Sequence, residues 1–248
     1  MSGSTRTDGR VERGNQTRRL VLGRTMDIAS VEGLEGLSLG RIATELKQSK
    51  SGVFARFGSK EELQLATVRA AAAVIARRVV TPPAELPPGP GKVWALCRNW
   101  LDYSAERVFA GGCFFSAVSA EFDARTGPVH DAVSAEFDAR TGPVHDAVSA
   151  ARREWIAYVE RTIEEAREAG GLVEDADAGQ LAFEIIALRE SANAHSVLLA
   201  DPAAYERAAR GIARRLRAEA TDAARDEVSA PGTWRRPPAG AAGPSSPP

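Results

Sequence analysis

The sequence predicts an all-α protein, with a small N-terminal unit of short helices followed by a C-terminal helical bundle. Ala, Leu, Glu and Arg, which are strong helix formers, dominate the interior of the 248-residue chain. Runs of β-branched residues, which would indicate strands, are few. Apolar residues instead recur every three to four positions in most long segments, and this is the period of an amphipathic helix.

The N-terminal unit begins with a polar segment. Residues 1–16 carry several arginines and no apolar period, so we expect a flexible basic arm that either follows a polyanion or is an ordinary mobile tail. Apolar residues at helical spacing then predict a helix from Thr17 to Val31 that ends at Gly33.

Three serines stand directly before apolar-periodic segments, where a hydroxyl can cap the first turn of a helix: Ser38, Ser49 and Ser59. We expect short helices over 39–46 and from Ser49 to Phe54. The third helix begins with a capping box, because Glu62 follows its serine by three residues, and is expected to run to about Val80. Residues 17–80 would therefore form one helical unit.

A proline-rich stretch divides the chain. Residues 81–91, TPPAELPPGPG, cannot continue a helix, and we expect a stiff linker there. The body over 92–220 is expected to hold helices near 92–109, 114–123, 146–169, 176–199 and 202–220. Residues 221–248 are expected to form a disordered tail, because their composition is rich in Pro, Gly and Ser.

The body contains a tandem duplication. The segment AVSAEFDARTGPVHD occupies residues 117–131 and again residues 132–146. Each copy holds a helix end, a Thr-Gly-Pro breaker and a helix start, so the extra copy predicts one short added helix between two loops. We interpret it as a tolerated insertion rather than a duplicated ligand-binding element, because loop insertions cost little free energy.

Several classes of protein are disfavoured. The two cysteines, Cys97 and Cys113, form no CxxC pair, so neither a disulfide framework nor a structural zinc site is expected, and a reducing cytoplasm is the expected compartment. No hydrolase, metalloprotease, P-loop or dinucleotide-binding motif occurs, so we expect no enzyme, no cofactor and no metal. No apolar stretch is long enough to cross a bilayer, and we expect no membrane partner.

The distribution of charge indicates a polyanion partner. The formal net charge is -1, yet residues 1–60 contain 11 Lys and Arg against 6 Asp and Glu. A basic segment on an acidic body suits a polyanion, although a solvated basic face gives the same composition.

The segment from Ser38 to Lys60 fits a helix-turn-helix. Two short helices meet at a tight turn near Lys47-Gln48, and the helix over 17–31 can pack across them. The second short helix starts Ser-Lys-Ser-Gly, with nothing to bury, and such a helix start can enter a major groove. The alternative is an ordinary helical corner with a solvated end.

Residues 17–66 resemble the N-terminal domain of TetR-family (tetracycline-repressor-like) regulators. The resemblance rests on linked motifs at fixed spacing: Gly33 and Gly36, Ser38, Ile42-Ala43, Ser49 to Phe54, Phe57, and Ser59-Lys60-Glu61-Glu62-Leu63. A weaker resemblance covers Gly111 to Phe115 and the AEFDARTGPV that follows, where the duplication interrupts it. It implies a helix-turn-helix DNA-binding domain and a helical ligand-binding and dimerisation domain.

Position by position, the resemblance implies that these residues contact double-stranded DNA: Ser38, Ser49, Lys50, Ser51, Gly52, Phe54, Arg56 and Lys60. Residues 50–52 would face the groove, and Lys60 would hold a phosphate with the N-terminus of its helix. Phe54 stands where the family usually has Tyr, and Arg56 where His is frequent. Lys47-Gln48 replaces a Gly and an apolar residue, which puts the turn geometry in question.

In the body, aromatic and apolar residues are candidates for a ligand pocket as well as for core: Trp94, Cys97, Trp100, Leu101, Cys113, Phe114, Trp155 and Phe183, with Asn193 or His195 as a polar handle. The resemblance implies an unknown small-molecule effector and a homodimer through the last two long helices. Leu181, Ile185, Leu188, Ala192 and Leu199 repeat there at helical spacing.

The leading hypothesis is a sequence-specific transcriptional regulator, a repressor released by a small molecule. A dimer would place two reading helices about 34–36 Å apart, on a palindromic operator. The alternative is a helical small-molecule-binding or protein-interaction module that has lost DNA binding.

Overall fold

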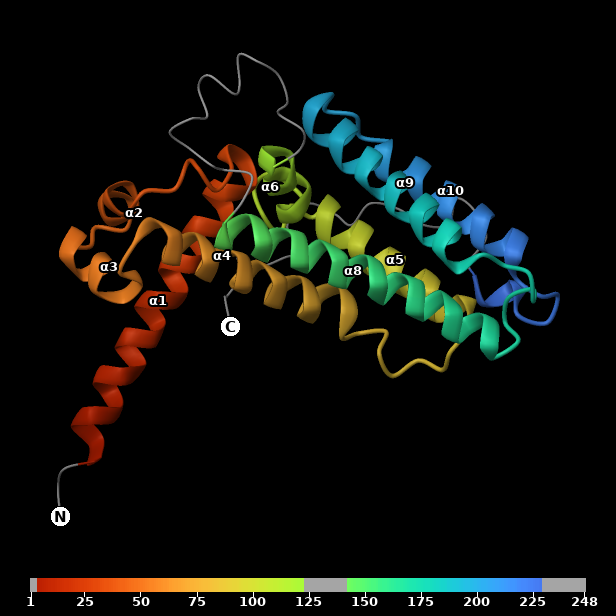
Figure 1. Cartoon of the computed structure of the whole chain (residues 1–248), viewed down its shortest axis with the longest axis horizontal. Coiled ribbons are helices and arrows are strands. Elements are labelled where there is room, and N and C mark those ends of the chain that lie inside the picture. The colour runs from red at the N-terminus through yellow and green to blue at the C-terminus, as the bar shows by residue number, and fades with distance from the viewer. Residues whose placement is uncertain (1–3, 123–141, 229–248) are drawn as a thin grey trace.

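The computed structural model describes residues 4–122 and 142–228, and the regular structure of these residues is helical, which confirms the predicted all-α class (Figure 1). The N-terminal unit contains α1 (Ser4–Glu32), α2 (Leu39–Glu45), α3 (Lys50–Phe57) and α4 (Lys60–Ile75), which continues as η1 (Ala76–Val80). The body contains α5 (Pro90–Ala105), α6 (Phe114–Phe122), α8 (Pro143–Glu168), α9 (Ala178–Leu198), α10 (Ala204–Glu219) and η3 (Arg225–Glu227).

The three predicted serine caps are present. Each hydroxyl oxygen accepts a hydrogen bond from the backbone N–H three residues later, at 3.1 Å for Ser38 and 3.0 Å for Ser49 and Ser59. Each bond satisfies a donor that the first turn of a helix leaves unpaired. The starts of α2, α3 and α4 are thus fixed by local sequence.

The turn between α2 and α3 keeps its tight geometry in spite of Lys47. This residue adopts φ +52°, a left-handed conformation that glycine reaches freely and that costs another residue roughly 1 kcal/mol. The burial of Ile42, Val53 and Phe57 on the inner faces of the two helices offsets that strain.

The expected flexible arm is wrong for residues 4–16, because α1 extends back to Ser4. Figure 1 shows its N-terminal part projecting away from the rest of the molecule. A helix that propagates from a packed segment does not repeat the cost of nucleation, and a projecting helix needs no apolar stripe. The apolar period therefore located only the packed part of α1, where Val21, Met26 and Ile28 are buried.

The body helices lie within a few residues of their predicted ranges. Residues 81–89 are not helical, as expected, but the predicted linker ends two residues early because Pro90 and Gly91 begin α5. Pro143 likewise begins α8. Proline suits this position, since the first turn of a helix needs no N–H there. The added helix predicted from the duplication falls on 123–141, outside the described residues.

The helices of the body lie side by side in a bundle. α9 packs between α8 and α10, and α5 contacts all three. The N-terminal unit joins the bundle through two helices, since α1 packs against α6 and α4 packs against α8. Helix α4 therefore belongs to both parts of the protein.

The predicted disordered tail is wrong for residues 221–228. Val228 is fully buried, and its carbonyl oxygen accepts a hydrogen bond from Arg217 at 2.7 Å. The carboxylate of Glu227 accepts one from the N–H of Gly91 at 3.1 Å. Composition did not reveal these contacts, because they join the segment to α10 and to the start of α5.

Among the described residues, no helix is long and apolar enough to cross a membrane.

Candidate functional site

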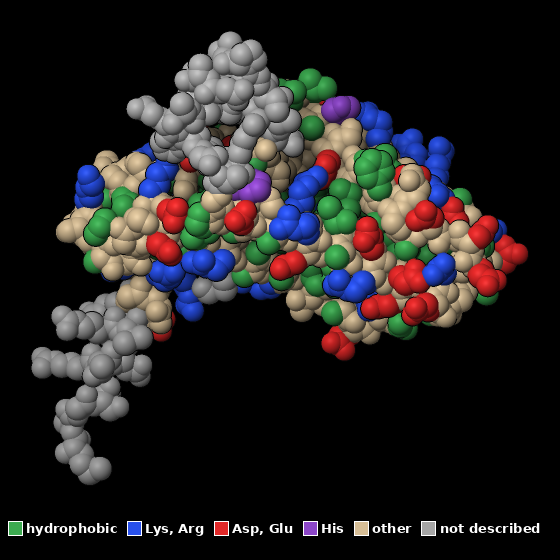
Figure 2. Space-filling view, viewed as in Figure 1, with side chains coloured by type: hydrophobic (Ala, Val, Ile, Leu, Met, Phe, Trp, Pro, Cys, Tyr) green, Lys and Arg blue, Asp and Glu red, His purple; other side chains and the backbone are tan. Residues whose placement is uncertain are grey.

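Helix α3 presents an exposed first turn. Val53 and Phe57 point into the core, whereas Lys50 and Ser51 are exposed and Gly52 is half-buried. Phe54, on the outer face, is 55% exposed. Figure 2 shows Lys and Arg side chains at this end of the molecule, whereas Asp and Glu gather at the opposite end of the body. The start of α3 is thus open to a large anionic partner.

Arg56 is held on its own helix. Its guanidinium donates a hydrogen bond to the carbonyl oxygen of Gly52 at 2.7 Å. Arg18 of α1 donates to the carbonyl oxygen of Arg56 at 3.3 Å and lies over the Phe57 ring at 4.7 Å. These contacts fix the C-terminal half of α3 against α1 and leave Arg56 half-buried beside the exposed turn.

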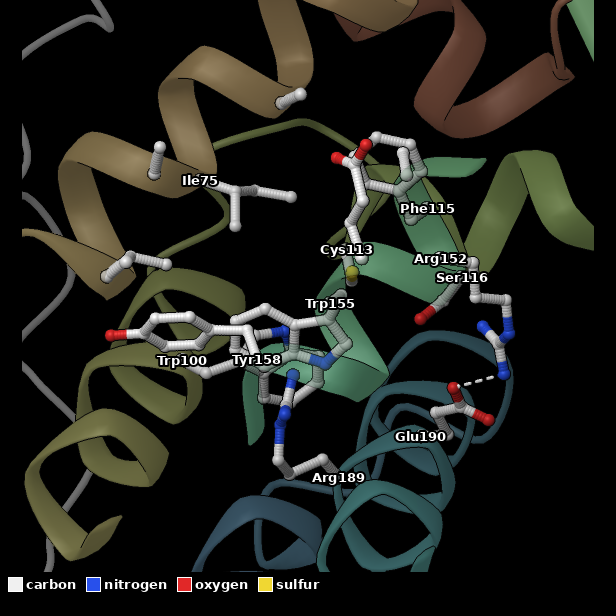
Figure 3. A pocket seen from close by; sticks show the side chains of 15 residues that line it. Ile75, Trp100, Cys113, Phe115, Ser116, Arg152, Trp155, Tyr158, Arg189 and Glu190 are labelled. Carbon is white, nitrogen blue, oxygen red and sulfur yellow. Dashed lines mark hydrogen bonds and ion pairs between the residues drawn. The ribbon is translucent and has the colours of Figure 1, made fainter. Parts of the chain in front are cut away.

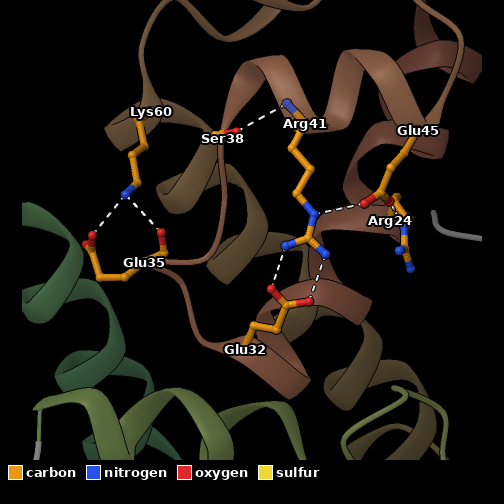
Figure 4. A network of polar contacts seen from close by, with 7 residues as sticks. All are labelled: Arg24, Glu32, Glu35, Ser38, Arg41, Glu45 and Lys60. Atoms are coloured by element: carbon orange, nitrogen blue, oxygen red, sulfur yellow. Dashed lines mark hydrogen bonds and ion pairs between the residues drawn. The ribbon is translucent and has the colours of Figure 1, made fainter.

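Lys60 has a protein partner. Its ammonium group donates to a carboxylate oxygen of Glu35 at 2.8 Å and to the carbonyl oxygen of Glu35 at 3.0 Å (Figure 4). The side chain therefore ties the start of α4 to the loop between α1 and α2. This engagement gives Lys60 a structural contact that the sequence did not indicate.

An ion-pair network that the sequence analysis missed joins α2 to α1. Arg41 donates to both carboxylate oxygens of Glu32, at 2.5 and 2.7 Å, and to Glu45 at 2.8 Å, and Glu45 also accepts from Arg24 (Figure 4). Hydrogen bonds from Arg41 lower the pKa of Glu32, and those from Arg24 and Arg41 lower the pKa of Glu45. The network orients α2 and, through the turn, α3.

A cavity of about 210 Å³ lies where the two parts of the protein meet (Figure 3). Six elements and the segment before α6 supply its walls: Ala72 and Ile75; Ala76 and Val80; Trp100; Cys113, Phe115 and Ser116; Ala151, Arg152, Glu154, Trp155 and Tyr158; Arg189 and Glu190. Apolar and aromatic side chains make up most of this surface, as is usual for small-molecule sites. Because α4 contributes to the wall, the cavity is in contact with the same helix that follows α3.

Three of the predicted pocket residues line this cavity, namely Trp100, Cys113 and Trp155. Four others are buried in the core and do not line it: Trp94, Cys97, Leu101 and Phe114. Phe183 is wrong as a pocket residue, because it is 69% exposed on the outer face of α9. Sequence period identifies an apolar face but not which neighbour that face meets.

Asn193 does not line this cavity. It lies in the wall of a second hollow between α1, α6, α8 and α9, and it is a buried polar centre. Its side-chain oxygen accepts hydrogen bonds from the Cys113 N–H and the Ser104 hydroxyl, both at 3.0 Å, and the Tyr205 hydroxyl lies 3.4 Å away. The site thus joins α9 to α5, to α10 and to the segment before α6. These protein groups occupy the acceptor that we expected a ligand to use.

Arg189, which the sequence analysis missed, is 4% exposed in the cavity wall. Its guanidinium carbon lies 4.0 Å from the centre of the Trp100 ring and 4.6 Å from that of Trp155. A signal was present, because Arg189 continues the buried face of α9 one turn after Ile185 and two turns after Leu181. An arginine at a core position of a helix indicates a buried charge that needs a partner.

Two protein-family models match the chain. The model described as "Bacterial regulatory proteins, tetR family" matches residues 21–67, and the model described as "Tetracyclin repressor-like, C-terminal domain" matches residues 89–135 and 132–212. The two segments of the second match overlap within the duplicated stretch. We found no matching sequence among curated proteins.

Solved structures share the fold. A TetR transcriptional regulator from Chloroflexus aurantiacus is 24% identical with a TM-score of 0.70, and the match covers 84% of this chain and 98% of that one. A TetR-family regulator from Streptomyces coelicolor is 24% identical with a TM-score of 0.64, covering 84% and 97%. AibR, solved with isovaleryl coenzyme A and operator DNA, is 16% identical with a TM-score of 0.54, covering 78% and 94%.

Proposed function

This chain belongs to the TetR family of bacterial regulatory proteins, and we propose that it is a dimeric repressor that a small molecule releases from a palindromic operator. As a member of that family it is a transcriptional regulator with an N-terminal DNA-binding domain and a C-terminal ligand-binding domain. We propose a cytoplasmic location, where bacterial operator DNA lies, and a binding role rather than a catalytic one.

The observation that carries the proposal is the exposed first turn of α3. We assign Lys50, Ser51 and Gly52 to base edges in the major groove, because small side chains allow close approach and Lys can donate to guanine. Phe54 is assigned to the rim of the groove, where its exposed ring can contact a thymine methyl group. Arg56 would add a salt-dependent phosphate contact.

The helix N-termini around α3 supply further phosphate contacts in this proposal. Ser38 and Ser49 are exposed at the starts of α2 and α3, where backbone N–H groups and the helix dipole favour an anion. Lys60 would bind a phosphate only if the phosphate replaced the Glu35 carboxylate. We therefore assign Lys60 a smaller share of the DNA affinity.

Helix α4 provides the connection between ligand and DNA. Its first turn is held beside the DNA-reading unit by Lys60, and its last turns supply Ala72 and Ile75 to the cavity wall, to which η1 adds Ala76. A ligand that binds more tightly when these turns are displaced would move α3 out of register with its half-site. The AibR structure, with a ligand and operator DNA, is consistent with such a use of the fold.

The outer face of α9 is the proposed dimer interface. Phe183 is 69% exposed and Leu198 is 82% exposed, and the exposed Ala187 and Ala194 lie between them on the same face. Leu181, Ile185 and Ala192, which suggested dimerisation in the sequence, are instead buried within the protomer. α10 packs beside α9 and would complete a four-helix contact between two protomers.

The dimer is tested by light scattering after size exclusion. A Phe183→Glu, Leu198→Glu double variant is expected to elute as a monomer that retains its helical circular dichroism spectrum. Leu86→Glu is the matched control, because Leu86 is exposed in the turn before α5. A dimeric double variant would refute the assigned interface.

DNA binding is tested by footprinting and gel shift on the DNA that flanks the gene of this protein. Lys50→Ala is expected to weaken operator binding by roughly 5- to 100-fold and to relax the preference at one base position. Arg153→Ala, an exposed change on α8, serves as the control and should bind like the wild type. A folded dimer that binds small molecules but protects no DNA would support the alternative module without DNA binding.

A further inference from the structure

We propose that the cavity binds a small aromatic monocarboxylate, whose carboxylate pairs with the buried guanidinium of Arg189. The inference rests on the proposed function and names the chemical class of its effector. Arg189 is a buried charged residue in the wall of this mostly apolar cavity of about 210 Å³.

The charge of Arg189 is incompletely balanced by the protein. Trp100 and Trp155 offer their ring faces at 4.0 and 4.6 Å, which favours a cation but provides no oxygen for an N–H to bond. The Nε atom of Arg189 is buried and has no hydrogen-bond partner among the described residues. Burial lowers the pKa of the guanidinium to about 10, which still leaves it charged at neutral pH.

The neighbouring acidic groups do not neutralise this charge. Glu190 is bound by Arg152 at 2.6 Å (Figure 3). Burial raises the pKa of the Cys97 thiol to about 12 and that of the Tyr103 hydroxyl well above its usual value, so both are neutral. Glu154 also lines the cavity, but it is exposed, and water screens its charge.

A carboxylate supplies what the site lacks. It carries the compensating charge, and its two oxygens match the donor geometry of a guanidinium. Because Arg189 is buried, such a pair is stronger there than in water, since the desolvation of the guanidinium has already occurred during folding. A neutral amide could offer the Nε–H an acceptor, but it would leave the positive charge of Arg189 uncompensated.

The remaining walls favour a flat apolar body. Trp155 and Tyr158 stack at 6.3 Å with an interplanar angle of 30°, and Ile75 and Phe115 also line the space. Roughly 150 Å³ accommodates a benzene ring, so about 210 Å³ leaves room for a carboxylate and one or two further carbons. Benzoate and phenylacetate have these dimensions.

The test is isothermal titration calorimetry on the full-length protein with benzoate and phenylacetate, each compared with its neutral amide. The wild type is expected to bind the acids, and to bind the amides at least about tenfold more weakly. Arg189→Met keeps much of the side-chain volume and should lose at least about tenfold in affinity for the acids, whereas Arg153→Met, on the surface of α8, should lose none.

Thermal unfolding gives a second measurement that does not depend on the choice of acid. Without ligand, Arg189→Met is expected to be at least as stable as the wild type, because it removes an uncompensated buried charge. Amides that bind as well as acids, acids that bind Arg189→Met unchanged, or no acid binding in the millimolar range would each overturn the inference. Operator binding, measured by gel shift, would survive those results, whereas failure to bind any DNA would refute the proposed function alone.

Discussion

Replacing Asn193 by Ala is expected to destabilise the body by about 2–4 kcal/mol. The change removes the oxygen that accepts hydrogen bonds from the Cys113 N–H and the Ser104 hydroxyl. Ser104 keeps a partner, because its hydroxyl lies 2.8 Å from that of Tyr205. The Cys113 N–H loses the acceptor that Asn193 supplied. A buried donor without an acceptor costs about 1–3 kcal/mol. The vacated volume adds about 1 kcal/mol.

Urea unfolding followed by circular dichroism, at a fixed protein concentration, measures this loss. The corresponding decrease in Tm is about 4–16 °C for a domain of this size. Asn15→Ala is the matched control, because Asn15 is exposed on α1 and should change the free energy of unfolding by less than about 0.5 kcal/mol. If Asn193→Ala also stayed within that range, the interpretation of Asn193 as a structural centre would be refuted, and a ligand-binding role would become the better explanation.

Three further predictions concern backbone and thiol chemistry. Gly111→Ala should cost more than about 2 kcal/mol in urea unfolding, because a Cβ there would lie 1.8 Å from the carbonyl oxygen of Ser30 and would push α1 from the body. Lys47→Gly should be neutral or stabilising by up to about 1 kcal/mol, because glycine relieves the left-handed strain but has more entropy when unfolded. Cys97 should resist iodoacetamide in the native protein at pH 8.5 and react in urea, because burial raises the pKa of its thiol to about 12.

Each of these predictions has a contrasting variant or condition. The control for Gly111→Ala is Gly40→Ala, in open space within α2, which should raise the free energy of unfolding by about 0.5–1 kcal/mol. The control for Lys47→Gly is Lys50→Gly in α3, which should lower it by about 1 kcal/mol. A loss of stability in Lys47→Gly similar to that in Lys50→Gly would contradict the strain argument. The raised pKa of Cys97 favours the native state below pH 9, and this contribution should fall as the pH rises from 9 toward 12. Equal labelling of native and unfolded Cys97 would contradict its burial.

Features that depend on neighbours along the chain could be predicted from the amino-acid sequence alone. Ser38, Ser49 and Ser59 located three helix starts, because a cap bonds to a backbone group only three residues away. The helix-turn-helix followed for the same reason, since the alternation of buried Val53 and Phe57 with exposed Lys50 and Ser51 is a property of one short helix. The family resemblance rested on this stretch.

Which helix faces meet became known from the three-dimensional structure. It placed the apolar Phe183 outside and the charged Arg189 inside, although both lie on one helix and side-chain polarity alone suggested the reverse. It also packed residues 221–228 against α5 and α10, through contacts such as that of Glu227 with Gly91. Contacts between segments distant in the sequence depend on the free energy of the whole packed protein. The apolar period of a single helix shows which face is buried, but not which helices pack against it.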